Sequence, residues 1–310
     1  MNRDESVKKL FLSVLGAVLI SASPNITFAK PEIKPLAPNI AETGSEYYRF
    51  SIKTFESADK KRKYRVWLGI PTQLNPLQQK EGYLYRSVFM LDGNAVMSHL
   101  DDQILKKLSE RDAPVLVAIG YETNLPFETA SRALDYTPAD LRTGLPAADP
   151  RSPQRMSGGS SEFKKIITEK ISPWVEQQIK LDPSRRALWG HSYGGLFVLD
   201  SLLTTAYFSH YFAASPSLSW ADQRMMQKIE MTAVPFPEKK QLLLMEGDIT
   251  AQVGTALSSN FDASGINNNR KVLSKFKVQG VDAKFLIYPD LKHGEMFKAS
   301  LLDVLLNRWM

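Results

Sequence analysis

A serine at position 192 stands between two glycines, Gly190 and Gly194, in the segment GHSYG. Glycines on both sides allow a strand to turn sharply into a helix, which exposes the serine hydroxyl as a nucleophile. A short apolar strand is predicted at 187–189 and an apolar helix at 196–204, so the context suits this turn. The other interpretation, a phosphate-binding loop, lacks both a GxGxxG pattern and a lysine after the glycines.

A serine hydroxyl needs a general base at neutral pH, and the sequence has four histidines. His293 follows a predicted strand, at the sheet edge where Ser192 would lie, and keeps the chain order nucleophile, acid, histidine. His191 adjoins the serine and would point to another side of the turn, His99 falls in a predicted helix, and His210 precedes a strand. We therefore predict His293 as the base; the alternative is a histidine that caps the last helix.

The acid partner of the base is less well defined by the sequence. Glu246 and Asp248 follow the predicted strand 241–245, and either carboxylate could orient the imidazole and stabilise its cation. We take Asp248 as the first candidate and Glu246 as the alternative, with Asp290 as a third. A serine–histidine pair without an acid stays open.

The oxyanion of an acyl-transfer intermediate needs two N–H donors. In a strand–nucleophile–helix arrangement, one donor is the residue after the nucleophile, Tyr193, and the other comes from the loop after an earlier strand. That loop follows the predicted strand 87–91, and it offers Asn94 first and Gly93 next.

The elements that must position these residues alternate between strands and helices. Continuous apolar runs at 87–91 and 115–119 end abruptly in polar residues or glycine, which is typical of parallel strands buried on both faces. Period-two segments at 45–52 and 64–70 predict antiparallel edge strands. Further strands are predicted at 211–214, 241–245 and 284–288, and further helices at 97–110, 161–180 with a kink at Pro173, and 295–307.

This alternation predicts an α/β fold, with a mostly parallel sheet, helices on both faces, and the active site at the carboxyl ends of the strands. Residues 122–161 show no periodicity and are rich in proline, glycine and aromatic residues. An irregular segment of this length inside a compact domain is usually a functional loop or lid.

The composition limits the possible partners and the compartment. Residues 1–29 combine a basic start, an apolar run and a small-residue cleavage site, so we expect a signal peptide for export to the periplasm, followed by one catalytic domain over 30–310. An uncleaved inner-membrane anchor is the alternative. The chain has no cysteine and a net charge of +6, and it shows no dense basic stretch, which favours a small anionic ligand over nucleic acid. We expect a monomer, with no metal or other cofactor in the chemistry.

Several motifs together resemble the putative-esterase branch of the α/β-hydrolases. The most specific is SRALDYTP at 131–138; others are GHSYGG at 190–195, ASPS at 214–217 and the pair His293-Gly294. The resemblance runs from about Arg49 to the C-terminus, and within the branch the chain looks most like periplasmic siderophore esterases. These act on enterobactin, a trilactone of dihydroxybenzoyl-serine, and on its glucosylated form. The resemblance implies lactone hydrolysis by a serine–histidine pair without a firm acid.

The resemblance also implies substrate contacts. Arg132 matches the family position that meets the anionic catecholate, and a guanidinium suits oxygen anions. Its alternative is a structural ion pair with Asp135. Tyr121, Tyr136 and Trp220 could stack on catechol rings, although such aromatics are as often the core of a loop.

Two rival functions stay open. One is a carboxylesterase or acyl transferase of the same fold with an unrelated substrate, because the fold does not fix the substrate. The other is a periplasmic siderophore-binding protein that has lost turnover.

Overall fold

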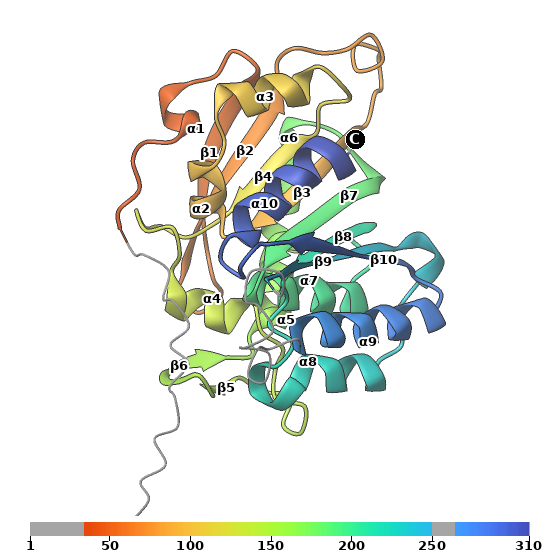
Figure 1. The fold of residues 1–310 in the computed structure, drawn as a ribbon. Coiled ribbons are helices and arrows are strands. Elements are labelled where there is room, and N and C mark those ends of the chain that lie inside the picture. The colour runs from red at the N-terminus through yellow and green to blue at the C-terminus, as the bar shows by residue number, and fades with distance from the viewer. Residues whose placement is uncertain (1–33, 250–263, 310) are drawn as a thin grey trace, which may run out of the picture. The chain divides into compact units, whose positions relative to one another are not determined.

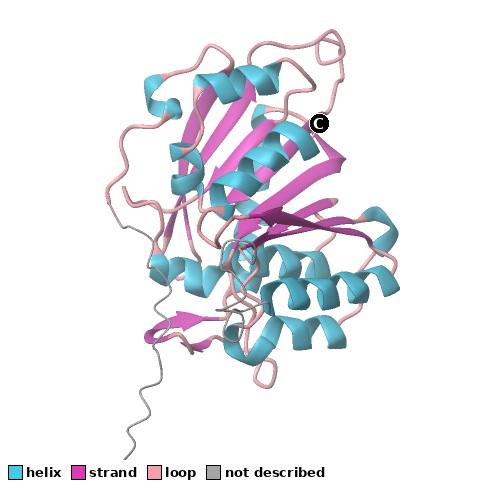
Figure 2. Cartoon of the chain, viewed as in Figure 1, coloured by secondary structure: helices cyan, strands magenta, loops and turns pink. Residues whose placement is uncertain are grey.

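The computed structural model describes residues 34–249 and 264–309, and its centre is one eight-stranded sheet (Figures 1 and 2). The strand order is β1-β2-β4-β3-β7-β8-β9-β10. β2 runs antiparallel to β1 and β4, and the other neighbours are parallel. The strands are β1 (Tyr48–Glu56), β2 (Lys63–Pro71), β3 (Tyr85–Leu91), β4 (Val115–Ile119), β7 (Leu181–His191), β8 (His210–Ala214), β9 (Gln241–Asp248) and β10 (Asp282–Pro289).

Helices cover both faces of this sheet, as Figure 1 shows. The helical segments are α1 (Ile40–Thr43), α2 (Gly93–Ser98), α3 (Asp102–Ser109), α4 (Thr129–Asp135), α5 (Ser160–Lys165), η1 (Ile166–Ile171), α6 (Ser172–Gln178), α7 (Tyr193–Thr204), α8 (Trp220–Met231), η2 (Pro237–Lys239), α9 (Ser264–Val278), α10 (Met296–Asp303) and η4 (Val304–Arg308).

Two apolar cores lie on opposite faces because strand side chains alternate. In β3, Phe89 and Leu91 join the core beneath α5, α7, α8 and α9, whereas Val88 and Met90 join the core beneath α2, α3 and α10. All four side chains are fully buried. The mostly parallel α/β fold predicted from the sequence is confirmed.

The predicted strands are present, but three predicted helices are interrupted. The helix expected over 295–307 is divided into α10 and the π-helical η4. The helix expected over 97–110 is divided into α2 and α3. The helix expected over 161–180 consists of α5, the π-helical η1 and α6. Pro173 lies at the start of α6, which continues the helical run of η1 without a break; its missing N–H therefore removes an ordinary helical hydrogen bond, and the wider π turn precedes it.

The segment expected to be irregular, 122–161, contains regular structure. It holds α4 and the antiparallel hairpin of β5 (Ala147–Asp149) and β6 (Ser152–Ser157). These elements are only seven, three and six residues long, too short to produce a clear periodic pattern. α8 and α9 are two further helices that the sequence pattern did not predict.

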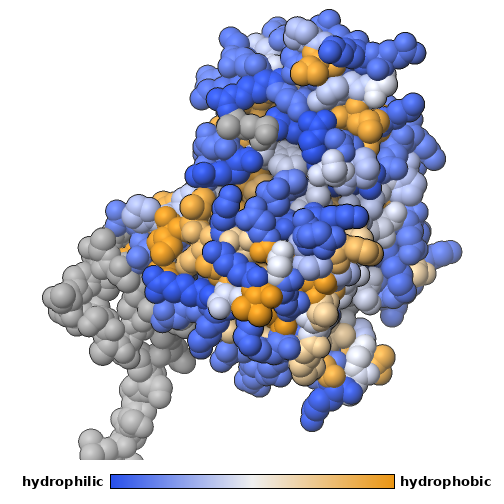
Figure 3. Space-filling view, turned by 90° about the vertical axis from the view of Figure 1, so that its right-hand side faces the viewer, coloured by the Kyte–Doolittle hydropathy of each residue, from blue (hydrophilic) through white to orange (hydrophobic). Residues whose placement is uncertain are grey.

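No helix within residues 34–249 and 264–309 is both long and apolar enough to cross a bilayer. Figure 3 shows a face on which hydrophilic residues predominate and hydrophobic residues form separate small groups. The predicted signal peptide, residues 1–29, lies outside the described residues.

Candidate active site

The nucleophile candidate Ser192 occupies the turn between β7 and α7 (Figure 1). Its φ of 60° and ψ of −114° are a strained conformation for a residue with a side chain. The chain passes close to itself here: a Cβ on Gly190 would lie 2.5 Å from the carbonyl oxygen of Gly194. Glycine is therefore required at position 190, and the turn has the geometry predicted for an exposed nucleophile.

The base candidate His293 reaches this serine. Its Nε2 lies 3.1 Å from Ser192 Oγ, a distance at which the ring can accept the hydroxyl proton. Ser217 Oγ also lies 3.1 Å from Ser192 Oγ, and the Ser217 N–H donates to the Ser192 carbonyl at 3.2 Å. Ser217 was not among the predicted site residues, because only the close packing of the loop after β8 on this turn reveals its position.

His191 holds the loop that carries the base. Its Nε2 lies 2.8 Å from the backbone carbonyl of His293. A carbonyl only accepts, so His191 must donate from Nε2. Burial, and then the nearby His293, lower the pKa of His191 well below its usual value, so the ring is neutral at pH 7. As expected, the His191 ring does not hydrogen-bond to Ser192; it contacts the base residue, His293, instead.

Neither predicted acid contacts the base. Glu246 is buried and accepts from Ser215 Oγ at 2.6 Å and from Asn269 Nδ2 at 2.9 Å. Asp248 ends β9 without a hydrogen bond to the imidazole. Within the part of the chain that the structure describes, no carboxylate hydrogen-bonds to the His293 ring.

The charge environment favours neutral His293. Although part of this residue is exposed to solvent, the protein packed around its ring lowers the pKa of His293. The positive charges of Arg151 and then Arg132 lower it further. The base is therefore ready to accept a proton at neutral pH.

The loop after β3 lies beside the start of α7. A Cβ on Gly194 would lie 3.5 Å from the side chain of Leu91 and 3.9 Å from an Asp92 carboxylate oxygen. Asp92, with a φ of 54°, follows the last residue of β3, and α2 begins at Gly93. The predicted second source of oxyanion donors is thus next to the nucleophile turn.

The side chain of Asn94 is fully engaged in that loop. Its Nδ2 donates to the carbonyls of Tyr121 at 3.1 Å and Thr123 at 2.9 Å, and its Oδ1 accepts from the Tyr121 N–H at 2.8 Å. Only the backbone N–H of Asn94 is left as a candidate oxyanion donor, together with those of Gly93 and Tyr193.

Arg132 forms a bidentate ion pair with a buried carboxylate. Its Nε and Nη2 each lie 2.9 Å from an Asp92 oxygen. The alternative pairing with Asp135 is wrong, because Asp135 pairs instead with Arg62 at 3.1 Å. The Nη1 of Arg132 has no hydrogen-bond partner among the described residues, so one amino group is available to a ligand.

Three arginines surround the ring of Tyr193. The guanidinium carbons of Arg151, Arg132 and Arg155 lie 5.5, 5.7 and 5.8 Å from its centroid. The buried Asp149 holds Arg155 through its Nε at 2.6 Å and accepts from the Tyr193 hydroxyl at 3.3 Å. We call Arg132, Arg151 and Arg155 the arginine cluster.

The three aromatic residues predicted to stack on a substrate are buried. Tyr121, Tyr136 and Trp220 are 3%, 0% and 1% exposed. The Tyr121 hydroxyl donates to Asp135 at 3.1 Å, Tyr136 accepts from the Asp92 N–H at 3.0 Å, and Trp220 donates to Asp149 at 3.0 Å. The stacking prediction is therefore wrong: these rings and their polar tips hold the loops that carry the arginines.

The environment of His293 predicts that kcat/KM falls only at low pH. The base must be neutral to accept a proton, so kcat/KM falls as the pH falls through its pKa. Because that pKa is lowered, we expect the midpoint below the ordinary value of about 6.5. Hydrolysis of a neutral aryl ester followed from about pH 4 to about pH 9 measures it. A midpoint at or above the ordinary value would contradict this account of the site.

The Arg132–Asp92 pair predicts a loss of stability on substitution. Arg132→Met leaves the Asp92 carboxylate, whose side chain is 1% exposed, without its cation. We expect the free energy of unfolding to fall by about 3–5 kcal/mol, measured by urea denaturation. The double variant with Asp92→Asn should recover part of this loss; no recovery would mean that Arg132 stabilises the fold by some other contact.

Comparisons with known proteins place the chain in one family. The family model described as putative esterase matches residues 57–306. The chain is 42% identical over 308 residues to the apo-salmochelin esterase of Escherichia coli O6:H1, strain CFT073, covering 97% of this chain and 91% of that protein. It is 28% identical over 266 residues to the ferri-bacillibactin esterase BesA of Bacillus subtilis, strain 168, covering 83% and 86%.

A solved structure of the enterobactin hydrolase IroE in complex with DFP is also similar. It superposes with a TM-score of 0.72 at 42% identity, covering 88% of this chain and 99% of that one.

Proposed function

The chain belongs to the putative esterase family, and on that premise we propose that it hydrolyses the lactone bonds of a catecholate siderophore such as enterobactin or its glucosylated form. The observation that carries the proposal is the contact of His293 Nε2 with Ser192 Oγ at 3.1 Å, beside the arginine cluster. The pair supplies ester hydrolysis, and the arginines supply a preference for an anionic substrate.

In the first step, Ser192 Oγ attacks the lactone carbonyl while His293 Nε2 takes the hydroxyl proton. The carbonyl oxygen becomes negatively charged, and the N–H groups of Tyr193 and of Gly93 or Asn94 hold it. When the C–O bond to the leaving serine unit breaks, His293 returns the proton to that alkoxide. Water, deprotonated by the same ring, then attacks the acyl-enzyme and releases a carboxylic acid together with free Ser192.

We propose that the histidine acts without a carboxylate partner. His191 holds its loop through the 2.8 Å contact to the His293 carbonyl, which replaces the orienting role of an acid. The substrate supplies the negative charge that a carboxylate partner of His293 would otherwise provide. A bound catecholate beside Arg132 and Arg151 screens their positive charges and raises the pKa of His293, so that the imidazolium formed during catalysis is less unfavourable.

The arginine cluster supports a catecholate rather than a neutral ester. A guanidinium presents planar, permanently charged donors to oxygen anions. Arg151 is exposed, and Arg132 keeps its Nη1 for a ligand after pairing with Asp92. Cations at this position cost a neutral substrate nothing but stabilise an anionic one.

We also propose that the protein acts in the periplasm as a monomer. The basic start and apolar run of residues 1–29 support export, with cleavage near residue 29 and an uncleaved anchor as the alternative.

Replacement of the nucleophile tests the reaction. We expect the wild-type protein to open enterobactin, and Ser192→Ala to lose this activity, with products followed by chromatography and mass spectrometry. Ser274→Ala, which changes an exposed serine in α9, is the matched control and should retain full activity. Hydrolysis of a simple aryl ester without ring opening would keep the serine mechanism and reject the siderophore. Tight siderophore binding with no turnover of either substrate would indicate a binding protein instead.

Replacement of one arginine tests the substrate class. Arg151 is exposed, so Arg151→Met should fold normally. We expect it to lower kcat/KM for enterobactin about tenfold, because one charged contact is lost, and to leave neutral aryl esters nearly unchanged. Arg142→Met is the control, since that side chain is 91% exposed and lies in the same region of the chain. Equal effects on anionic and neutral esters would argue against selection of an anion.

A further inference from the structure

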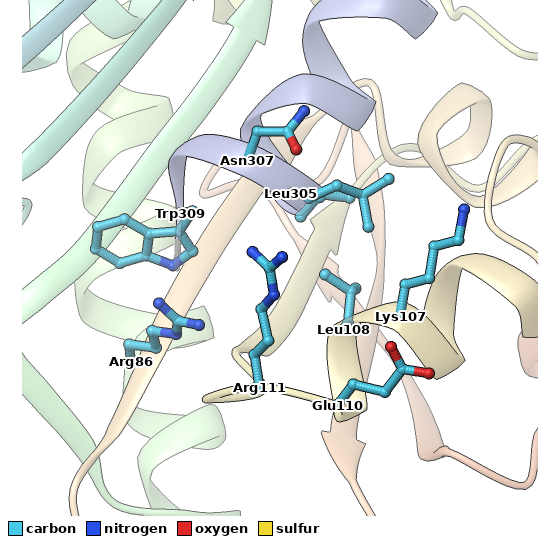
Figure 4. Close-up of a pocket in the computed structure, with 9 residues that line it drawn as sticks. Arg86, Lys107, Leu108, Glu110, Arg111, Leu305, Asn307 and Trp309 are labelled. Atoms are coloured by element: carbon cyan, nitrogen blue, oxygen red, sulfur yellow. The ribbon is translucent and has the colours of Figure 1, made fainter.

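A cavity of about 320 Å³ lies at the opposite end of the sheet from Ser192 (Figure 4). Arg86, near the amino end of β3, is part of its wall, whereas Asp92 beside the nucleophile turn follows the carboxyl end of the same strand. The strand separates the two places by about 20 Å. The main lining residues come from β3, the end of α3 and η4, and are Arg86, Lys107, Leu108, Arg111, Leu305 and Trp309.

One buried side chain in this wall has a hydrogen-bond donor without an acceptor. Trp309 is 5% exposed, and its Nε1 has no partner among the described residues. Arg86, which is 4% exposed, donates from its Nε to the Asp112 carbonyl, and its terminal nitrogens form no hydrogen bond within residues 34–249 and 264–309. Buried donors are nearly always satisfied in folded proteins, so the Trp309 indole N–H indicates a missing acceptor.

The charge of the wall favours an anion as that acceptor. The lining residues include three cations, Arg86, Lys107 and Arg111, and one carboxylate, Glu110 (Figure 4). The side chains of Lys107 and Arg111 are exposed, and neither forms an ion pair in the described part of the chain. The nearby Asp112 lies 3.5 Å from Arg86, but it is closer to Arg185, at 2.9 Å.

Another part of the wall is apolar, although Asn307 also lines the cavity. Leu108 and Leu305 are buried and, with the indole of Trp309, line the cavity beside the cations. An inorganic anion would satisfy the donors but leave this apolar surface and much of the volume unfilled. An organic anion matches both parts of the wall, since guanidinium groups bind carboxylates in a bidentate manner.

We propose that this cavity binds a small organic carboxylate. Its carboxylate accepts from Arg86, Arg111 and the Trp309 indole N–H, and its apolar body packs against Leu108 and Leu305. The site is independent of Ser192 and of the proposed siderophore reaction.

Titration of the full chain with benzoate at constant ionic strength tests the site. The indole N–H of Trp309 is observed by ¹⁵N NMR and assigned with Trp309→Phe among the five tryptophans of the sequence. We expect a saturable shift of this signal, and at least about tenfold weaker binding in Arg111→Met, because a charge-assisted hydrogen bond is lost. Benzyl alcohol and inorganic phosphate should bind much more weakly than benzoate.

Two lysines on α3 form a matched pair. Both Lys106 and Lys107 are exposed, but only Lys107 lines the cavity. Lys107→Met should weaken benzoate binding several-fold, and Lys106→Met should leave it unchanged. The proposal is overturned if no saturable shift occurs, if the two lysine variants lose affinity equally, or if phosphate or benzyl alcohol binds as well as benzoate. Unchanged thermal melting of the variants excludes misfolding as the cause.

Discussion

The turn at Ser192 is the constraint on which the active site depends. Its unfavourable φ persists because hydrogen bonds hold it on both sides: the Ser192 N–H donates to the Ala214 carbonyl at 2.9 Å, and the Leu196 N–H donates to the Ser192 carbonyl at 3.2 Å. Gly195 must also lie close to Pro216, since a Cβ there would come within 2.9 Å of the proline. The strained serine is thus fixed by β8 and the loop after it, which also carries Ser217.

Charge around the site is organised by two buried carboxylates. Asp92 holds Arg132, and Asp149 holds Arg155, so two cations are placed beside Tyr193 with their countercharges hidden beneath them. The carboxylates are 1% and 0% exposed, and a ligand therefore meets the arginines rather than the acids. Burial of the ring, and then the positive charges of Arg151 and Arg132, lower the pKa of His293 and keep it neutral. Arg132 thus contributes both to ligand selection and to the readiness of the base.

The sequence predicted what local patterns and chain order determine. The nucleophile turn followed from glycine spacing between a strand and a helix, and the choice of His293 followed from strand order. Ser217, His191 and the arginine cluster could not be predicted as partners, because packing of distant loops brings them together. The prediction for the aromatic residues was wrong for another reason. A ring that supports a loop and a ring that stacks on a ligand look the same in sequence. Only their burial shows that Tyr136 and Trp220 do not form a stacking surface.

One buried side chain of the β5–β6 hairpin anchors it to two helices beside the site. Asp149 contacts Arg155 within the hairpin, Tyr193 on α7 and Trp220 on α8. Arg151, at the tip of the hairpin, makes no side-chain hydrogen bond to Asp149, although its guanidinium lies 5.5 Å from the centroid of the Tyr193 ring. A substitution at the hairpin tip can therefore change the ligand contacts of Arg151 while Asp149, the serine and its base keep their positions.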